Sequence, residues 1–130
     1  MPFYTVDTHA LVWYFTNDSR LGTHARIIFR ESIEAQATLL IPTIVLAELL
    51  DIAEKKRVPV TFKMILRKIQ KATNFAIVPL GIEIVKKAQS LTGVGELHDR
   101  LIAATALYFK STLVTRDEKL QGVKNLKVIW

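Results

Sequence analysis

The sequence predicts an α/β fold, a three-layer α/β/α sandwich with a central, mainly parallel sheet of four to five strands. Two patterns along the 130 residues support this prediction. Short apolar runs alternate with longer segments of helical periodicity from one end of the chain to the other. The apolar runs are also continuous, without the polar alternation of a half-exposed strand, so we expect the sheet to be covered on both faces.

The first third of the chain begins with a strand and continues with two helices. Residues 3–6 (Phe-Tyr-Thr-Val) form a short apolar run that ends at Asp7. Residues 9–15 favour a helix, which the turn-forming residues 17–19 interrupt. A second helix is expected at 23–36, where isoleucines recur on one side and charged residues on the other.

The middle third contains the second strand and two further helices. Residues 38–41 (Thr-Leu-Leu-Ile) form the strand, and Pro42 stops it and suits the first turn of the next helix. That helix is expected at 43–56. Segment 61–73 places apolar residues opposite lysines and arginines, which predicts an amphipathic helix.

The last third repeats the alternation of strands and helices. Strand 75–78 precedes helix 81–91, and after a glycine-containing break a nearly all-apolar helix spans 97–110. A helix that is apolar all round is buried in the folded protein. Strands are expected at 111–115 and 126–129. Because the sequence shows neither repeats nor linkers, we expect residues 1–130 to form a single domain.

The composition restricts the classes of function. The formal net charge is +6, and a basic surface attracts nucleic acid, although it can equally be an ordinary solvated face. The absence of cysteine excludes disulfides and thiolate metal sites and suits the cytosol. The N-terminal run MPFYTV has no features of a signal peptide, and no apolar stretch approaches the ~20 residues of a membrane span. We therefore expect a cytoplasmic protein with no membrane partner.

Four acids follow strands or begin helices, where ligands of open parallel sheets bind. They are Asp7 after the first strand, Glu48 in the helix after the second, Asp99 at the start of the apolar helix, and Asp117 after the fourth strand. Each also has an ordinary structural interpretation: a helix cap or turn for Asp7 and Asp117, a solvated boundary residue for Glu48, and a dipole-stabilising residue for Asp99.

Taken together, the four acids predict a metal site. Carboxylates gathered at one edge of a sheet cannot all stay ionised without a compensating cation. Oxygen ligands favour a hard ion, so we expect Mg²⁺ or Mn²⁺. The three histidines show no metal-ligand spacing, and His9 is expected to be packed against its neighbours rather than to line the cleft.

The segments that contain these acids resemble the PIN-domain family. The matching segments are VDTHALVW with Asp7, IPTIVLAELL with Glu48, HDRLIAATA with Asp99, and LVTRD with Thr115 and Asp117. They occur in the order of the family and cover nearly the whole chain, and DTHALVW is similar to the VapC-like toxins of type II toxin–antitoxin systems.

This resemblance implies a PIN-like fold and a Mg²⁺- or Mn²⁺-dependent ribonuclease that pairs with a small antitoxin protein and forms a homodimer. Asp7 and Asp99 would bind the metal directly, and Glu48 and Asp117 would complete its shell. Thr115 would orient Asp117 through a hydroxyl hydrogen bond. Hydrolysis of the RNA would leave a 3′-hydroxyl and a 5′-phosphate.

Basic residues near these acids are candidates for guiding RNA. Clusters at 55–57 and 63–71 fit this function but also fit an ordinary solvated helical face. Arg116 is closer to the acids and is the better candidate for a phosphate contact. The apolar helical segments 46–52 and 65–69 could form a dimer surface or belong to the core.

Three alternatives compete with a ribonuclease toxin. A receiver-like signalling domain would need paired acids after the first strand, whereas the chain has one, and strand 75–78 runs into Pro79-Leu80-Gly81 instead of a phosphoacceptor aspartate. A non-catalytic PIN-like module would bind RNA or protein without cutting, and the four filled acidic positions argue against it. A housekeeping or DNA-directed nuclease would use the same residues.

Overall fold

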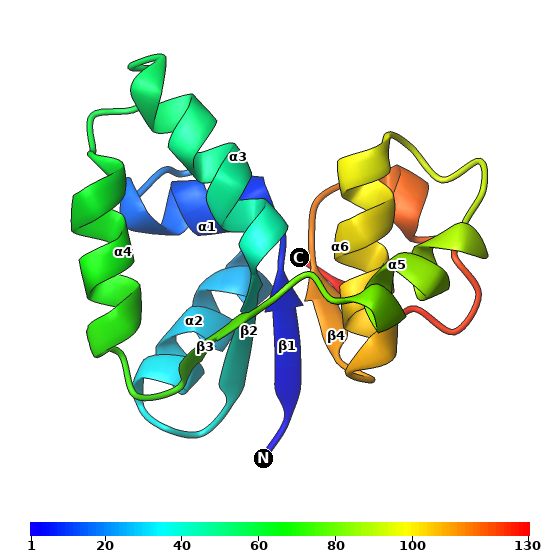
Figure 1. Cartoon of the computed structure of the whole chain (residues 1–130). Helices are drawn as coiled ribbons and strands as arrows, with labels where there is room; N and C mark the ends of the chain where they lie inside the picture. Colours follow the sequence, from blue (N-terminus) through cyan, green and yellow to red (C-terminus); the bar gives the residue numbers. More distant parts are fainter.

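The structure, a computed structural model that describes residues 1–130, is built around a five-stranded parallel sheet (Figure 1). The strands lie in the order β3-β2-β1-β4-β5, and every neighbouring pair is parallel. Their bounds are β1 (Phe3–Val6), β2 (Thr38–Pro42), β3 (Phe75–Val78), β4 (Thr112–Val114) and β5 (Val128–Ile129). The predicted α/β class with a parallel sheet is therefore confirmed.

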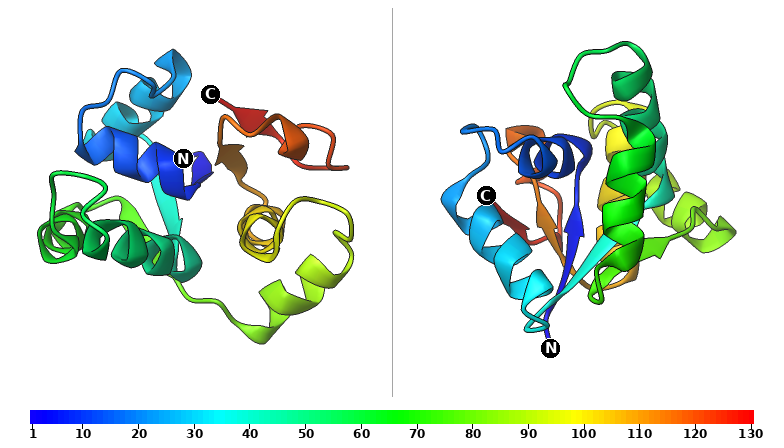
Figure 2. Two further views of the ribbon diagram at one scale, coloured as in Figure 1. Left: turned by 90° about the horizontal axis from the view of Figure 1, so that it is seen from above. Right: turned by 90° about the vertical axis from the view of Figure 1, so that its left-hand side faces the viewer.

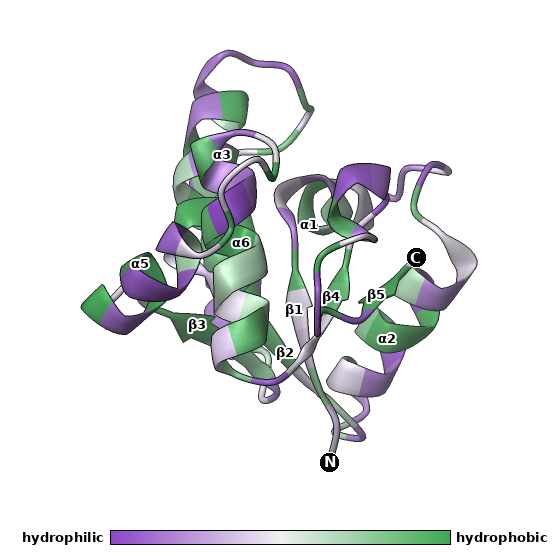
Figure 3. Cartoon of the chain, turned by 90° about the vertical axis from the view of Figure 1, so that its right-hand side faces the viewer, coloured by the Kyte–Doolittle hydropathy of each residue, from purple (hydrophilic) through white to green (hydrophobic).

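Helices cover both faces of the sheet, as Figures 2 and 3 show. One face carries α1 (Thr8–Phe15) and α2 (Thr23–Ile33). The other face carries α3 (Thr43–Glu54), α4 (Phe62–Lys71), α5 (Ile82–Gln89) and α6 (Leu97–Tyr108). A short 3-10 helix, η1 (Glu118–Leu120), was not expected from the sequence. None of the helices has the length and apolar character needed to cross a membrane.

Several predicted helices end two or three residues too late. The helix expected at 23–36 ends at Ile33, the one at 43–56 ends at Glu54, and the one at 97–110 ends at Tyr108. Ala35, Lys56 and Lys110 follow these ends with φ values of 62°, 51° and 53°. A residue in the left-handed region cannot continue a right-handed helix, and this change of conformation is not encoded in hydrophobic periodicity.

A core of 29 buried residues joins the sheet to both helical layers. Phe29 of α2 is fully buried and stacks on Tyr14 of α1, with ring centroids 4.1 Å apart. In α6, every residue from Leu101 to Ala106 is buried, as its apolar sequence predicts. Figure 3 shows β3, β4 and β5 as mainly hydrophobic.

The apolar segments considered for a dimer surface belong mostly to this core. Leu46, Leu49, Ile65 and Ile69 are all buried. Among the leucines of this stretch of α3, only Leu50 is exposed, with 38% of its surface accessible. Most of these residues therefore belong to the core, whereas Leu50 and Met64 of the same two helices are exposed.

The order of the strands creates a switch point between β1 and β4. The chain moves from β1 to β2 and β3 on one side and then returns to place β4 and β5 on the other side of β1. The backbone N–H of Asp7 donates to the carbonyl of Val114 at 3.2 Å, so the carboxyl ends of the two strands lie together. In open α/β sheets, ligands bind in the crevice beyond such a switch point.

Candidate active site

Asp7 lies at the switch point and is held there through both carboxylate oxygens. It directly follows β1 and caps α1, because Oδ1 accepts a hydrogen bond from the backbone N–H of Ala10 at 2.9 Å. Its Oδ2 accepts a hydrogen bond from the hydroxyl of Thr115. The predicted helix cap is thus real, and it also fixes the orientation of the carboxylate at the end of the sheet.

Thr115 connects Asp7 to Asp117. Thr115 is fully buried at the end of β4, and its hydroxyl accepts a hydrogen bond from the Asp117 backbone N–H at 3.1 Å. The expected hydroxyl hydrogen bond between Thr115 and Asp117 is therefore present, with the Thr115 hydroxyl as the acceptor, while its own proton is donated to Asp7. The Asp117 carboxylate caps η1 through the backbone N–H of Lys119 at 3.0 Å.

Asp99 lies in the first turn of α6 beneath the loop that precedes this helix. Its Oδ2 accepts a hydrogen bond from the backbone N–H of Glu96 at 3.4 Å. Gly95 has a φ of +57°, and a Cβ atom at this position would lie 2.9 Å from Asp99 Oδ2. Only glycine therefore combines this backbone conformation with so close an approach to the carboxylate.

Glu48 of α3 contacts the hydroxyl of Thr8 and the imidazole of His98. The hydroxyl of Thr8 donates to Glu48 Oε1 at 2.6 Å. His98 Nε2 lies 3.5 Å from Glu48 Oε2 and 3.6 Å from Asp99 Oδ1, and its Nδ1 lies 3.5 Å from Glu96 Oε2. His98 is thus surrounded by three carboxylates and stands between Glu48 and Asp99.

Three of the four candidate acids, Asp7, Asp99 and Asp117, line one cleft of about 500 Å³. Glu48 does not line this cleft but lies behind His98, which does. No three acidic, histidine or cysteine side chains are close enough together to hold a metal ion between them. The structure therefore gathers the candidate acids at one edge of the sheet without forming a closed metal cage. The remaining residues of the cleft are His9, Trp13, Arg20, Glu96, Arg116 and Lys119.

The electrostatics of Asp7 distinguish it from the other acids. Burial raises the pKa of Asp7, and the nearby charge of Asp117 raises it further, while the hydrogen bonds from Thr115 and Ala10 and the charge of His9 lower it. No lysine or arginine forms a salt bridge with Asp7, so its negative charge has no strong partner within the chain. A desolvated carboxylate without a cation is a common feature of functional sites.

Trp13 supports two arginines at the rim of the cleft. The guanidinium carbons of Arg20 and Arg116 each lie 4.6 Å from its ring centroid. Arg20 also pairs with Asp18 at 2.7 Å, and its hydrogen bonds lower the pKa of Asp18 to about 2. Arg116 has no such acidic partner and keeps its charge available to a ligand.

His9 and His98 line the cleft, which corrects the expectation for the histidines. His9 was expected to be packed, but it is exposed and tilts against Trp13 with centroids 5.4 Å apart. His9 and Trp13 are four residues apart on α1 and so share a face, a spacing that could have placed both beside Asp7. Arg20 comes from an irregular loop, and no sequence pattern places it in the cleft.

The acids of the cleft are the kind of donor that a hard divalent cation prefers. Asp7, Asp99 and Asp117 offer carboxylate oxygens to the same cleft, and no lysine or arginine forms a salt bridge with Asp7. Oxygen ligands of this kind suit Mg²⁺ and Mn²⁺ better than softer metals.

Comparison with known proteins supports this fold. The chain aligns over 98% of its length with VapBC2 from Rickettsia felis bound to a DNA fragment from their promoter, with a TM-score of 0.74, 20% identity and 98% of that chain covered. A toxin–antitoxin complex from Klebsiella pneumoniae gives a TM-score of 0.66 at 21% identity over 98% of this chain and 96% of that chain. The PIN domain endonuclease Utp24 gives 0.53 at 19% identity, over 97% of this chain and 82% of that chain.

The family of the chain follows from its match to the sequence profile of a known domain. No curated protein matches the chain significantly. The profile of the PIN domain, however, matches residues 4–126, which include all four candidate acids and Thr115. The chain belongs to the PIN-domain family.

Proposed function

We propose that this protein is a metal-dependent endoribonuclease and the toxin of a toxin–antitoxin pair. The observation that carries the proposal is the position of Asp7: it lies at the switch point of the sheet, is desolvated without a lysine or arginine partner, and shares its cleft with Asp99 and Asp117. Membership of the PIN-domain family and the likeness to the toxin–antitoxin complex support it.

Asp7, Asp99 and Asp117 would hold Mg²⁺ or Mn²⁺, and Glu48, which lies 3.5 Å from His98 of the same cleft, would complete the shell. A divalent ion supplies positive charge to a phosphodiester and lowers the pKa of an attacking water. Residues of the chain orient the carboxylates: Thr115 and the Ala10 N–H fix the carboxylate of Asp7, and Thr8 fixes that of Glu48.

The basic rim of the cleft would bind the RNA backbone. Arg116 has no acidic partner, and its guanidinium lies over the ring of Trp13. The guanidinium can therefore bind a phosphate in a defined orientation. Lys119 lines the same cleft and adds a second positive charge. The expected products are a 3′-hydroxyl and a 5′-phosphate.

The proposed partners are RNA as the substrate, a small antitoxin protein and a second copy of the chain. Because the proposed substrate is cellular RNA, the protein would act in the cytoplasm. The antitoxin would block the cleft that Asp7, Asp99 and Asp117 line.

The decisive experiment measures cleavage of mixed-sequence RNA by the purified protein with Mg²⁺ or Mn²⁺, with EDTA, and with Asp7→Asn. Metal-dependent cleavage that the variant loses supports the proposal. A protein that binds RNA but never cuts it, whatever the metal, would instead be the non-catalytic PIN-like module. That alternative is favoured by one observation: Asp7, Asp99 and Asp117 all make local capping hydrogen bonds that would keep them in place without a metal.

A further inference from the structure

A second concave surface, lined by lysines, runs along α6 away from the carboxylate cleft. Two adjoining hollows of about 410 Å³ each form it, and both are lined by Lys87, Leu107 and Asn125. Lys124 completes the basic lining of the first hollow, and Lys110 and Lys127 that of the second. We call this surface the lysine groove, after Lys87, Lys110, Lys124 and Lys127.

The lysine groove begins where the carboxylate cleft ends. Val94 lines the groove and Glu96, two residues later, lines the cleft. On the opposite wall, Lys119 lines the cleft and Gly122 the groove. The same two loops therefore border both cavities, and an extended chain that occupies the groove would be led toward the acids.

The charges of the lysine groove are unpaired. All four lysines are exposed, and none of them forms a salt bridge, whereas Lys86 on the same helix as Lys87 pairs with Glu83 at 3.7 Å. No aspartate or glutamate lines either hollow. Four uncompensated ammonium groups in a concave surface produce a positive potential that favours a polyanion.

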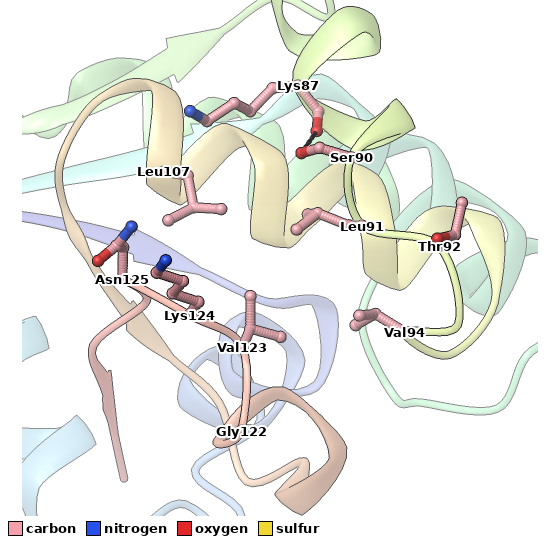
Figure 4. Close-up of a pocket in the computed structure, with 10 residues that line it drawn as sticks. All are labelled: Lys87, Ser90, Leu91, Thr92, Val94, Leu107, Gly122, Val123, Lys124 and Asn125. Carbon is pink, nitrogen blue, oxygen red and sulfur yellow. Dashed lines mark hydrogen bonds between the residues drawn. The ribbon is translucent and has the colours of Figure 1, made fainter.

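The remaining lining fits a nucleic-acid strand better than an acidic peptide. Figure 4 shows Lys87 and Lys124 on either side of Leu107, with the Asn125 amide beside Lys124. Leu91 and Val94 add apolar surface, and Ser90 and Thr92 add hydroxyl groups. Phosphates can contact the ammonium groups while bases lie against the apolar wall. The groove has no aromatic side chain for base stacking, so the contacts would be independent of sequence.

We propose that the lysine groove binds the backbone of single-stranded RNA and leads it into the carboxylate cleft. This inference rests on the proposed function, because it concerns the substrate of the same site. It places the RNA path along α6 and not on the basic clusters of α3 and α4.

The binding of a fluorescent single-stranded RNA tests the proposal. The affinity is measured by fluorescence anisotropy in EDTA between 50 and 200 mM salt, roughly the range over which phosphate contacts are resolved. Two variants carry the same loss of charge: Lys87, Lys110, Lys124 and Lys127 all changed to Gln, and, as the control, Lys56, Lys63, Lys68 and Lys71 all changed to Gln. All eight lysines are exposed, so both variants are expected to keep the Tm of the parent protein.

The groove variant is expected to bind RNA at least ~10-fold more weakly than the control. Its salt slope should fall by about 0.7 for each lost phosphate contact, or about 3 in total. An equal loss in both variants would mean that only net charge matters, and an intact slope in the groove variant would exclude RNA from the groove; either result overturns the proposal.

A polyglutamate of similar charge serves as a second probe. If the groove variant loses polyglutamate but keeps RNA, the surface binds an acidic protein segment and the proposal is wrong. Because EDTA prevents metal-dependent cleavage, these results do not depend on activity. Failure of the proposed function would appear separately, as a parent protein that cuts no RNA with metal present.

Discussion

The hydroxyl of Thr115 donates a hydrogen bond to Oδ2 of Asp7, and this bond joins the carboxyl ends of β4 and β1. These strands are not consecutive in the sequence; they meet because the chain reverses its direction of winding at β1. Since Thr115 also accepts the Asp117 N–H, one buried hydroxyl sets the positions of two candidate metal ligands. The geometry of the cleft therefore depends on a residue that does not itself face it.

Thr115→Val is expected to reduce RNA cleavage by about 10- to 100-fold, in line with the loss of groups that orient metal ligands. Valine keeps the shape but removes both hydrogen bonds, which leaves the Asp117 N–H without a partner and raises the pKa of Asp7 further. The measurement is kcat/KM together with calorimetric Mn²⁺ affinity. Thr115→Ser keeps the hydroxyl and should retain most activity; if it is as impaired as valine, packing and not the hydrogen bond matters.

Asp7→Asn is expected to stabilise the metal-free protein at pH 7 and therefore to raise its Tm. Burial raises the pKa of Asp7 above its ordinary value of 3.8, so the folded state is destabilised when this group ionises. The cost is absent below the unfolded pKa, grows as pH rises toward the folded pKa and is complete above it. Asparagine avoids it and can still cap α1 through its amide oxygen, although its amide nitrogen cannot accept the Thr115 hydroxyl, which offsets part of the gain.

Thermal unfolding in EDTA at pH 3.5 and pH 7 checks this prediction, with pH values chosen below and well above the ordinary pKa of 3.8. The advantage of Asp7→Asn should be present at the higher pH and small at the lower one. Divalent metal should stabilise the parent protein but not the variant. A variant that is less stable at both pH values would show that the ionised carboxylate stabilises the fold, contrary to this account.

The fold was predictable because its signals are local. Each strand is a short apolar run, and the helices show either an amphipathic periodicity or, at 97–110, a long apolar stretch, so all five strands and six helices were placed correctly to within a few residues. The site depends on long-range relationships that periodicity does not contain. The Thr8–Glu48 bond spans 40 residues and the Thr115–Asp7 bond spans 108, and the approach of His98 to Glu48 follows only from how α3 and α6 pack.

Arg116→Gln is expected to raise the KM for RNA by about 10-fold while changing kcat less, because the guanidinium would contribute a charged contact to the substrate. Steady-state kinetics at low salt give both constants. Arg30→Gln on α2 serves as the matched control, since Arg30 is exposed and outside the cleft but carries the same charge. Equal effects of the two substitutions would indicate that only the net charge of the protein attracts RNA.

Gly95→Ala is expected to lower metal affinity and activity by about 10-fold or more, in the range found when the orientation of a ligand is disturbed. The new Cβ would lie 2.9 Å from Asp99 Oδ2, so either the carboxylate or the loop must move. The positive φ of +57° also strains the backbone of an alanine, so this substitution lowers the stability of the fold as well. Gly93→Ala provides the control, because Gly93 has a φ of +83° but no atom within 4 Å of its added Cβ. Both variants should lose similar stability in thermal unfolding, but only Gly95→Ala should weaken Mn²⁺ binding measured by calorimetry. If the two variants bind metal equally well, Asp99 does not need its present position to act as a ligand.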